Sequence, residues 1–185
     1  MTGRGHFVRL ADIVSKVMFV FPRCFASFVY SIVKNISGSI AMGVRYVCLK
    51  RLAASCGKNV AIFPFVTLKH IEKMHFGDNV SIHTMCYIDA CGGVELGNDV
   101  SIAHSCSLVS FDHSYTDVST PIKYNPIVKG RIVVEDDVWI GCGCRILQGV
   151  TIGTRCIIAA GAVVTGSVES HHIFGGVPAK AIKTI

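Results

Sequence analysis

The sequence predicts an all-β solenoid in which short strands wind into about five stacked coils. Three observations support this fold. An aliphatic residue returns at every sixth position across 132–168, and a second, generally smaller apolar residue follows each one four positions later. The similar hexapeptides FGDNVS and LGNDVS begin at Phe76 and Leu96. A period of six fits neither an α-helix nor a long strand, but it fits a short strand and a turn that repeat along a solenoid.

The N-terminal residues 1–55 lack this period and are predicted to be helical. The stretch from Phe7 to Tyr30 is rich in Val, Phe and Ile. Breaks near Pro22 and near 37–39 would divide the segment into two or three short helices. Its charge-free runs are shorter than the roughly 20 residues that a membrane-spanning helix needs.

The positive charge of the chain is concentrated at this end. The whole chain has a formal net charge of +6, yet residues 1–58 combine nine Lys or Arg residues with the single acid Asp12. Two roles for the helical segment stay open: a cap over the open end of the solenoid, and a basic, apolar surface in which residues 1–50 contact an anionic membrane. No nucleic-acid partner is expected.

The β-helix is predicted to span 56–169. Extra residues interrupt the period near Lys73 and again near Val94, so that each early coil is slightly longer than three hexapeptides. This pattern indicates three short strands per coil with one bulged corner. The Gly-Asn and Gly-Asp neighbours of the hexapeptides suit corners where a positive φ is tolerated. The stretch 132–168 is free of such insertions.

Two segments leave the coil pattern. After Leu108 the six-residue register is lost until Val134, which predicts a protruding loop at about 110–130. Long loops in compact domains are usually functional. Residues 170–185 form a C-terminal extension, which we expect to be extended and to end in a short helix after Pro178.

The nine cysteines do not form a disulfide pattern. Cys86, Cys106, Cys144 and Cys156 occupy the small inward position of the six-residue register, where they act as buried hydrophobic residues. The sequence has neither a CxxC metal pair nor a secretory signal with a cleavage site. We therefore expect reduced thiols, no bound metal and a cytoplasmic protein, at the inner face of the membrane if the N-terminal segment binds lipid.

Four motifs point to a known family. They are FDHSYTD in the loop, DDVWIGCGCRILQGVTIG and AAGAVVTGSV in the late coils, and the closing FGGVPAKAIK. With these motifs, residues 56–185 resemble the hexapeptide-repeat acyltransferases, and within them the galactoside, maltose and nodulation-factor O-acetyltransferases. The resemblance implies a left-handed parallel β-helix, acetyl-CoA as co-substrate, and a homotrimer with active sites between subunits.

The resemblance also implies where the acceptor reacts. His113 matches the family's catalytic histidine, and an imidazole suits a general base because its ordinary pKa lies near neutrality. Asp89 matches a position that contacts acceptor hydroxyls. Some relatives carry an asparagine pair where this chain has His83 and Met85, which leaves the acceptor open. We expect His83, Met85, Asp89 and His104 to line the acceptor pocket; a surface or corner role for His83 and His104 is the alternative.

The cofactor positions follow in the late coils and the tail. Trp139 is the only tryptophan, and because it follows the inward Val138 it is expected to point outward and to contact a ligand or subunit. The remaining positions that the family uses for the pantetheine arm and the nucleotide phosphates are Gly141, Cys142, Ala159, Ala160, Thr165, Lys180 and Lys183. Cys142 is not expected to be a nucleophile because no neighbouring residue activates it.

The predicted function is acetyl transfer from acetyl-CoA to a sugar hydroxyl in a surface polysaccharide or its precursor, by direct attack in a ternary complex. Acetyl transfer to an amino sugar, serine or antibiotic hydroxyl is the first alternative. A zinc carbonic anhydrase is the second alternative, and it needs three histidine ligands. Only His70 and His75 have a spacing that suggests such ligands, and no third partner is evident. An inactive scaffold is the third alternative; the intact His113 argues against it.

Overall fold

A computed structural model describes residues 18–185 together with Ala11, Val14 and Ser15. Helix α2 (Arg23–Val33) follows Pro22, and helix α3 (Ser39–Leu52) follows Gly38, whose φ of 108° is accessible to glycine. Both predicted breaks are therefore present. The helical prediction for most of residues 1–17 lies outside the described residues. In the described part of the chain, no helix has both the length and the apolar character to cross a bilayer.

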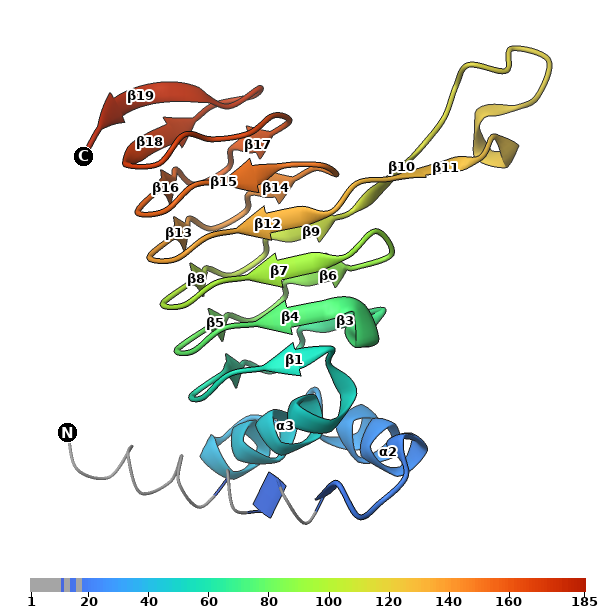
Figure 1. Cartoon of the computed structure of the whole chain (residues 1–185), viewed down its shortest axis with the longest axis vertical. Helices are drawn as coiled ribbons and strands as arrows, with labels where there is room; N and C mark the ends of the chain where they lie inside the picture. The colour runs from blue at the N-terminus through green and yellow to red at the C-terminus, as the bar shows by residue number, and fades with distance from the viewer. Residues whose placement is uncertain (1–10, 12–13, 16–17) are drawn as a thin grey trace.

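Three parallel sheets form the walls of the solenoid (Figure 1). Sheet A contains β1 (Ser55–Cys56), β4 (Met74–Phe76), β7 (Val94–Leu96), β12 (Ile132–Val134) and β15 (Thr151–Ile152). Sheet B contains β2 (Ala61–Ile62), β5 (Ser81–Ile82), β8 (Ser101–Ile102), β13 (Trp139–Ile140), β16 (Ile157–Ile158), β18 (His172–Gly175) and the antiparallel β19 (Lys180–Thr184). Sheet C contains β3 (Thr67–Lys69), β6 (Tyr87–Asp89), β9 (Ser107–Val109), β14 (Arg145–Ile146) and β17 (Val163–Val164).

The coils wind left-handed. Sheet A strands run from right to left across the front of Figure 1 while the chain climbs from the helices towards β19. General rules for parallel crossovers predict the opposite hand, so only the family resemblance implied this one. Five coils are complete, and a bridge between Ile152 and Val168 together with β18 begins a sixth.

The core is a stack of the predicted inward residues. Ile82, Ile102, Ile140 and Ile158 follow one another in sheet B and are fully buried. The inward cysteines are buried and free, and each thiol donates to a carbonyl oxygen. For Cys106 Sγ the acceptor is Gly141 O at 3.0 Å. Burial of this kind removes apolar surface from water along the full length of the solenoid.

The extra residues of the early coils lie near Lys73 and Val94, as predicted: the first form the 3-10 turn η1 (Ile71–Lys73), and the second lie around Gly92 and Gly93, immediately before β7. One local prediction needs correction. The tail after Pro178 is not a helix. Strand β19 turns back and pairs antiparallel with β18. This pairing satisfies backbone groups that a helix of a few residues would leave open.

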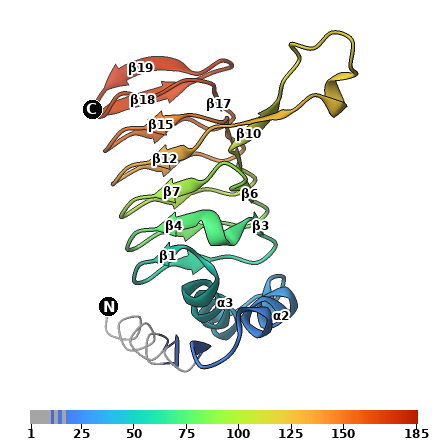
Figure 2. The same ribbon diagram turned by 45° about the vertical axis from the view of Figure 1, so that its right-hand side comes forward.

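The predicted loop is an arm with regular structure. Strands β10 (Phe111–His113) and β11 (Ile127–Lys129) pair antiparallel, and a 3-10 turn, η2 (Ile122–Tyr124), lies near the tip. The arm leaves the solenoid after β9 and returns at β12, so it projects from the corner between sheets C and A. Figures 1 and 2 both show it standing clear of the coils.

Candidate active site

His113 ends strand β10 and is exposed on the arm. It pairs with Ile127 across the antiparallel ribbon, and its ring meets the ring of Phe111 edge-on with centroids 6.5 Å apart. The side chain is thus held on a short β-ribbon rather than on an irregular loop. Its exposure leaves the imidazole accessible to a substrate or to another subunit.

The acidic neighbours of His113 do not contact its imidazole ring. The Asp112 carboxylate accepts a hydrogen bond of 2.8 Å from the backbone N–H of His113, and Asp117 accepts bonds from the amide and hydroxyl of Ser119. Bonds from the Ser119 hydroxyl and then from the Thr120 hydroxyl lower the pKa of Asp117. Asp112 therefore fixes the backbone of the arm, and neither contact orients the imidazole.

Asp89 is buried at the end of β6, beside the base of the arm. Its Oδ1 lies 2.9 Å from Nδ1 of His70 and accepts a bond of 3.1 Å from the amide of Cys91. Its Oδ2 accepts a bond of 3.2 Å from the hydroxyl of Tyr87. The carboxylate predicted to bind an acceptor is therefore already engaged within its own chain.

Ser110 connects Asp89 to both ends of the arm at its base. Its amide and hydroxyl both donate to the carbonyl oxygen of Asp89, at 3.1 and 2.8 Å. Its hydroxyl accepts from the amide of Gly92 at 2.8 Å, and its carbonyl accepts from the amide of Gly130 at 3.0 Å. Ser110 is fully buried, so this small polar network fixes where the arm begins and ends.

The other predicted acceptor residues lie at a different corner, between sheets B and C. His83 stacks face to face on Phe63 of the preceding coil, with ring centroids 4.5 Å apart. Met85 follows with a positive φ and 68% of its surface exposed. His104 is exposed one coil further on, and its carbonyl accepts from the amide of Gly143.

Trp139 points outward from β13, as predicted, and is 54% exposed. It lines a groove on the outer face of sheet B. The other residues lining that groove are Asp99, Ser101, Asp137, Val138, Arg155, Cys156, Ile157 and Ile185. An exposed indole beside such a groove is suited to a flat or apolar ligand group.

The small residues of the late coils meet at the corner between sheets B and C. Gly141 donates its amide to Ile158 O, and the amide of Gly161 donates to Cys142 O. A Cβ on Gly141 would lie 2.7 Å from the amide nitrogen of Ala160, so glycine is required there. Ala159 donates its amide to Phe174 O. These amides complete the backbone hydrogen bonds between coils. Only small side chains project from the corner, so its backbone is not covered by bulky groups.

Three remaining cofactor candidates lie around the end of the solenoid. Thr165 is exposed after β17, at the corner between sheets C and A. Lys180 pairs with Gly175, whose Cβ would lie 3.0 Å from that of Ala159, so this lysine is close to the corner between sheets B and C. Lys183 is exposed further along β19.

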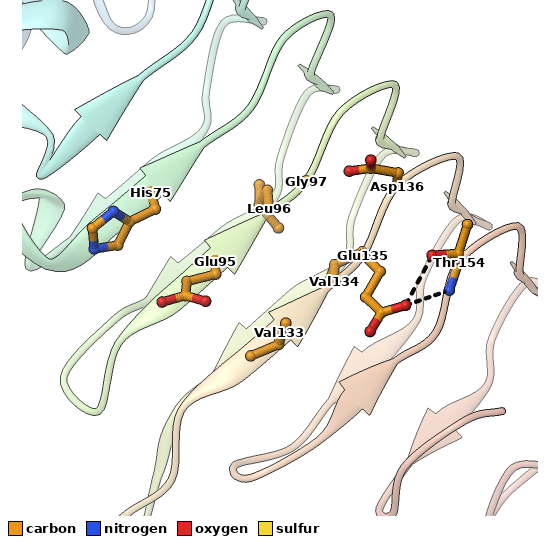
Figure 3. A pocket seen from close by; sticks show the side chains of 9 residues that line it. All are labelled: His75, Glu95, Leu96, Gly97, Val133, Val134, Glu135, Asp136 and Thr154. Carbon is orange, nitrogen blue, oxygen red and sulfur yellow. Dashed lines mark hydrogen bonds between the residues drawn. The ribbon is translucent and has the colours of Figure 1, made fainter. Parts of the chain in front are cut away.

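A shallow hollow on the face of sheet A contains none of the predicted site residues (Figure 3). Its lining residues are His75, Glu95, Leu96, Gly97, Val133, Val134, Glu135, Asp136 and Thr154. Glu135 Oε2 accepts bonds from the amide and hydroxyl of Thr154 at 2.9 and 2.8 Å. The Glu135 carboxylate therefore ties adjacent coils together.

The site residues thus form two groups within one chain. The corner between sheets B and C carries His83, Met85, His104, Gly141, Cys142, Ala159 and Ala160, with Trp139 beside it. The corner between sheets C and A carries Asp89, Thr165 and the arm with His113. A strand of three residues, about 10 Å long, lies between the two corners.

Among the described residues, no group of three or more His, Cys, Asp or Glu side chains is placed to hold a metal ion. His70 and His75 have separate partners: His70 contacts Asp89, and His75 Nδ1 lies 3.0 Å from the hydroxyl of Ser55. The suggestive spacing of these two histidines therefore does not bring them to a common site.

Comparisons with known proteins agree with the solenoid fold. Residues 131–166 match the family described as bacterial transferase hexapeptide (six repeats). A hexapeptide-repeat acetyltransferase from Vibrio cholerae, solved in complex with acetyl coenzyme A, superposes with a TM-score of 0.76 at 28% identity, over 88% of this chain and 86% of that one. Residues 131–166 therefore form a hexapeptide-repeat segment, and the fold is that of the hexapeptide-repeat acetyltransferases.

Two sequence relatives extend the comparison. A probable acetyltransferase of Mycobacterium tuberculosis is 35% identical over 114 residues, which cover 62% of this chain and 38% of that protein. A putative lipopolysaccharide biosynthesis O-acetyl transferase of Escherichia coli is 29% identical over 115 residues, which cover 58% of this chain and 59% of that protein. The chain therefore spans less than two thirds of the length of either relative.

Sequence reasoning did not predict the contacts of three residues in the site region: Phe63, His70 (considered only as a zinc ligand) and Ser110. Phe63 could have been found, because it precedes His83 by one full early coil, the same spacing at which strands β2 and β5 pair. The spacing of His70 and Asp89 falls one position short of a full coil, which breaks that rule. The contacts of Ser110 depend on the path of the arm and have no sequence signal that we recognise.

Proposed function

We propose that this protein transfers an acetyl group from acetyl-CoA to a sugar hydroxyl in a surface polysaccharide or its precursor. The observation that carries the proposal is the placement of an exposed histidine, His113, on an ordered arm of a hexapeptide-repeat solenoid. The relative solved with acetyl coenzyme A supports the acetyl donor, and the E. coli relative supports a polysaccharide acceptor.

His113 acts as the general base in this proposal. It takes the proton of the acceptor hydroxyl while the acceptor oxygen bonds to the acetyl carbon, and the thioester C–S bond breaks. The proton then passes to the leaving sulfur. Because the acceptor oxygen attacks the thioester directly, no covalent enzyme intermediate forms. Asp112 and Ser110 hold the backbone of the arm, and hence the position of the imidazole, through the bonds described above.

The donor is held along the corner between sheets B and C. Gly141, Cys142, Ala159 and Ala160 keep that corner free of bulky side chains, which allows a long, thin pantetheine arm to approach the backbone. Trp139 borders the groove on sheet B, and Lys180 and Lys183 supply positive charge for the phosphates. Thr165 belongs to the same proposed set but lies at the next corner.

A complete site requires two subunits in this proposal. His113 and the donor groove lie on different corners of one chain, so the arm of one copy would face the groove of the next in a cyclic trimer. Asp89 then supports the arm, while His83, Met85 and His104 border the groove from which the acceptor is reached. We propose a cytoplasmic location for this assembly.

The test is acetyl transfer by the full chain to a panel of acceptors: free sugars, nucleotide sugars, lipid-linked saccharides, polysaccharide and an amino sugar. We expect thiol release from acetyl-CoA together with the mass gain of one acetyl group on a sugar oxygen. His113→Ala should abolish both the thiol release and the mass gain and leave the oligomer intact. His75→Ala, on sheet A, should keep both the activity and the oligomer. Transfer to nitrogen only, or an active His113→Ala variant, contradicts the proposal.

Subunit mixing tests the shared site. His113→Ala chains and Trp139→Ala chains should each be nearly inactive alone. After unfolding and refolding together, about a quarter of the sites should combine an intact arm with an intact groove. Recovery of activity on mixing supports the shared site, and no recovery from folded mixed trimers excludes it.

A further inference from the structure

The outer face of α2 carries an exposed apolar stripe. Phe25, Phe28 and Ile32 are 40, 63 and 54% exposed and are spaced by three and four residues, so they lie along one side of the helix. Phe21 and Ile36, four residues before and after them, are also exposed. We call Phe21, Phe25, Phe28, Ile32 and Ile36 the α2 stripe.

The opposite face of α2 packs inward, and Ser27 and Ser31 are exposed polar residues of the same helix. Ala26 and Tyr30 are buried in the core that also contains residues of α3. A surface helix normally presents polar residues to water, whereas the α2 stripe presents apolar ones. Large exposed apolar patches mark sites that contact a partner or a membrane. The α2 stripe therefore requires an occupant that α3 does not provide.

The charges around the α2 stripe have one sign. Arg23 begins α2 and Lys34 follows its last residue, and both are exposed, although the Arg23 guanidinium also donates a hydrogen bond to the carbonyl oxygen of Leu52. The Arg51 guanidinium lies 5.5 Å from the centroid of the Phe19 ring, next to the stripe. The sequence contains no Asp or Glu between residues 13 and 71. The described segment that carries the α2 stripe therefore has basic side chains and no acidic ones.

We propose that the α2 stripe docks this protein on the surface of an anionic lipid bilayer. Phenylalanine and isoleucine side chains at this spacing can enter the boundary between headgroups and acyl chains while the helix lies flat on the membrane. Arg23 and Lys34 then lie at the level of the anionic headgroups, where each basic side chain is attracted to the negative surface. Apolar area and positive charge together fit this one surface.

A second copy of the chain fits the stripe less well. Symmetric pairing of two α2 stripes in antiparallel orientation would bring Arg23 of one copy towards Lys34 of the other, and like charges repel. The stripe also lies at the helical end of the solenoid, away from β19 (Figure 1). Docking through this end leaves the arm and both site corners available, and it does not depend on the proposed transferase activity.

The experiment is flotation of the full chain with vesicles of phosphatidylcholine alone or mixed with phosphatidylglycerol. We expect binding to the mixed vesicles, weaker binding to phosphatidylcholine, and a decrease as salt rises. Phe28→Ser with Ile32→Ser should lower partitioning about tenfold or more, because two large apolar side chains leave the bilayer. Arg23→Gln with Lys34→Gln should reduce the preference for anionic vesicles several-fold.

A control variant removes apolar side chains elsewhere that are more exposed than Phe28 and Ile32. Tyr115→Ser with Val118→Ser, on the arm, should leave vesicle binding unchanged. Phe28→Trp adds a direct readout, because its fluorescence should shift to the blue and be quenched by brominated lipids only when the stripe inserts. Circular dichroism checks that each variant remains folded.

Three results would overturn the proposal. The full chain could stay in solution with anionic vesicles at low salt. The Phe28→Ser/Ile32→Ser variant could bind as well as the unaltered chain. Alternatively, light scattering could show that this variant dissociates an oligomer that never bound vesicles, in which case the α2 stripe is an interface between copies.

Discussion

The hydroxyl of Ser110 donates a hydrogen bond of 2.8 Å to the carbonyl oxygen of Asp89 on the adjacent strand. Asp89 also binds His70, Tyr87 and the amide of Cys91 through its carboxylate. One buried residue pair therefore joins the coil wall to the start of the arm, and through Gly130 to its end. The position of His113 depends on this pair.

Ser110→Ala should destabilise the protein and slow the proposed reaction. The substitution removes the acceptor for the amide of Gly92, and an unsatisfied, partly buried donor costs about 1–3 kcal/mol. Urea unfolding measures the stability, and thiol release measures turnover. Ser119→Ala, at the exposed tip, should change stability by less than about 0.5 kcal/mol. Equal behaviour of the two variants would contradict the role of Ser110.

Gly141→Ala should be strongly destabilising, whereas Gly166→Ala should not. The added methyl group at 141 would lie 2.7 Å from both Ile158 O and the amide nitrogen of Ala160, which are backbone atoms that cannot move aside locally. At 166 the same group meets open space. We expect a loss above about 2 kcal/mol for Gly141→Ala by urea unfolding. A Gly141→Ala protein as stable as the control would contradict the close approach of the coils.

Tyr30→Phe should maintain or raise stability at neutral pH. The hydroxyl of Tyr30 is buried without a hydrogen-bond partner in the described part of the chain, a state that costs about 1–3 kcal/mol. Removing the oxygen while keeping the ring preserves the packing against α3. A loss of more than about 1 kcal/mol in urea unfolding would show that this hydroxyl has a partner after all.

The same residue predicts an alkaline effect. Burial raises the pKa of Tyr30 from 10.0 to about 12. The pKa of Tyr30 is higher in the folded state than in the unfolded state. The free energy of unfolding linked to this ionisation is therefore fully present below pH 10, and it falls by roughly 2–3 kcal/mol as pH rises from about 10 to 12. Tyr30→Phe should remove this component, measured as the difference between the two stability–pH curves. Parallel curves would contradict the raised pKa.

Asp89→Asn should lower the pKa of Tyr87. Partial burial, the negative charge of Asp89 and the hydrogen bond to it all raise that pKa. Losing the charge removes the second cause and weakens the third. The measurement is phenolate absorbance during titration, with Tyr87→Phe subtracted in each background. An unchanged difference curve would mean that Asp89 and Tyr87 do not interact in solution.

The stacked coils were predictable because each inward position is a local property of the chain. Ile102, Ile140 and Ile158 had to be buried together once the period was known. The hairpin at the C-terminus was not predictable in the same way. Every residue of β19 is exposed, so no alternation of buried and exposed side chains distinguishes this strand from a helix end.

The candidate site was predictable in part. The position of His113 on a protruding segment followed from the interrupted register, and the outward direction of Trp139 followed from its inward neighbour. The separation of Asp89 from His83 onto different corners did not. The two residues are close in sequence, but a single hexapeptide step in a solenoid leads from one wall to the next.

The bond between the amide of Gly130 and the carbonyl of Ser110 closes the arm at its base. We expect that the tip of the arm, beyond the ribbon that carries His113, can change in length or composition without shifting the register of the coils before or after it. The arm can accordingly be treated as a cassette. Grafting a different tip onto the β10–β11 ribbon would keep His113 and is a route to a new acceptor range for the proposed reaction.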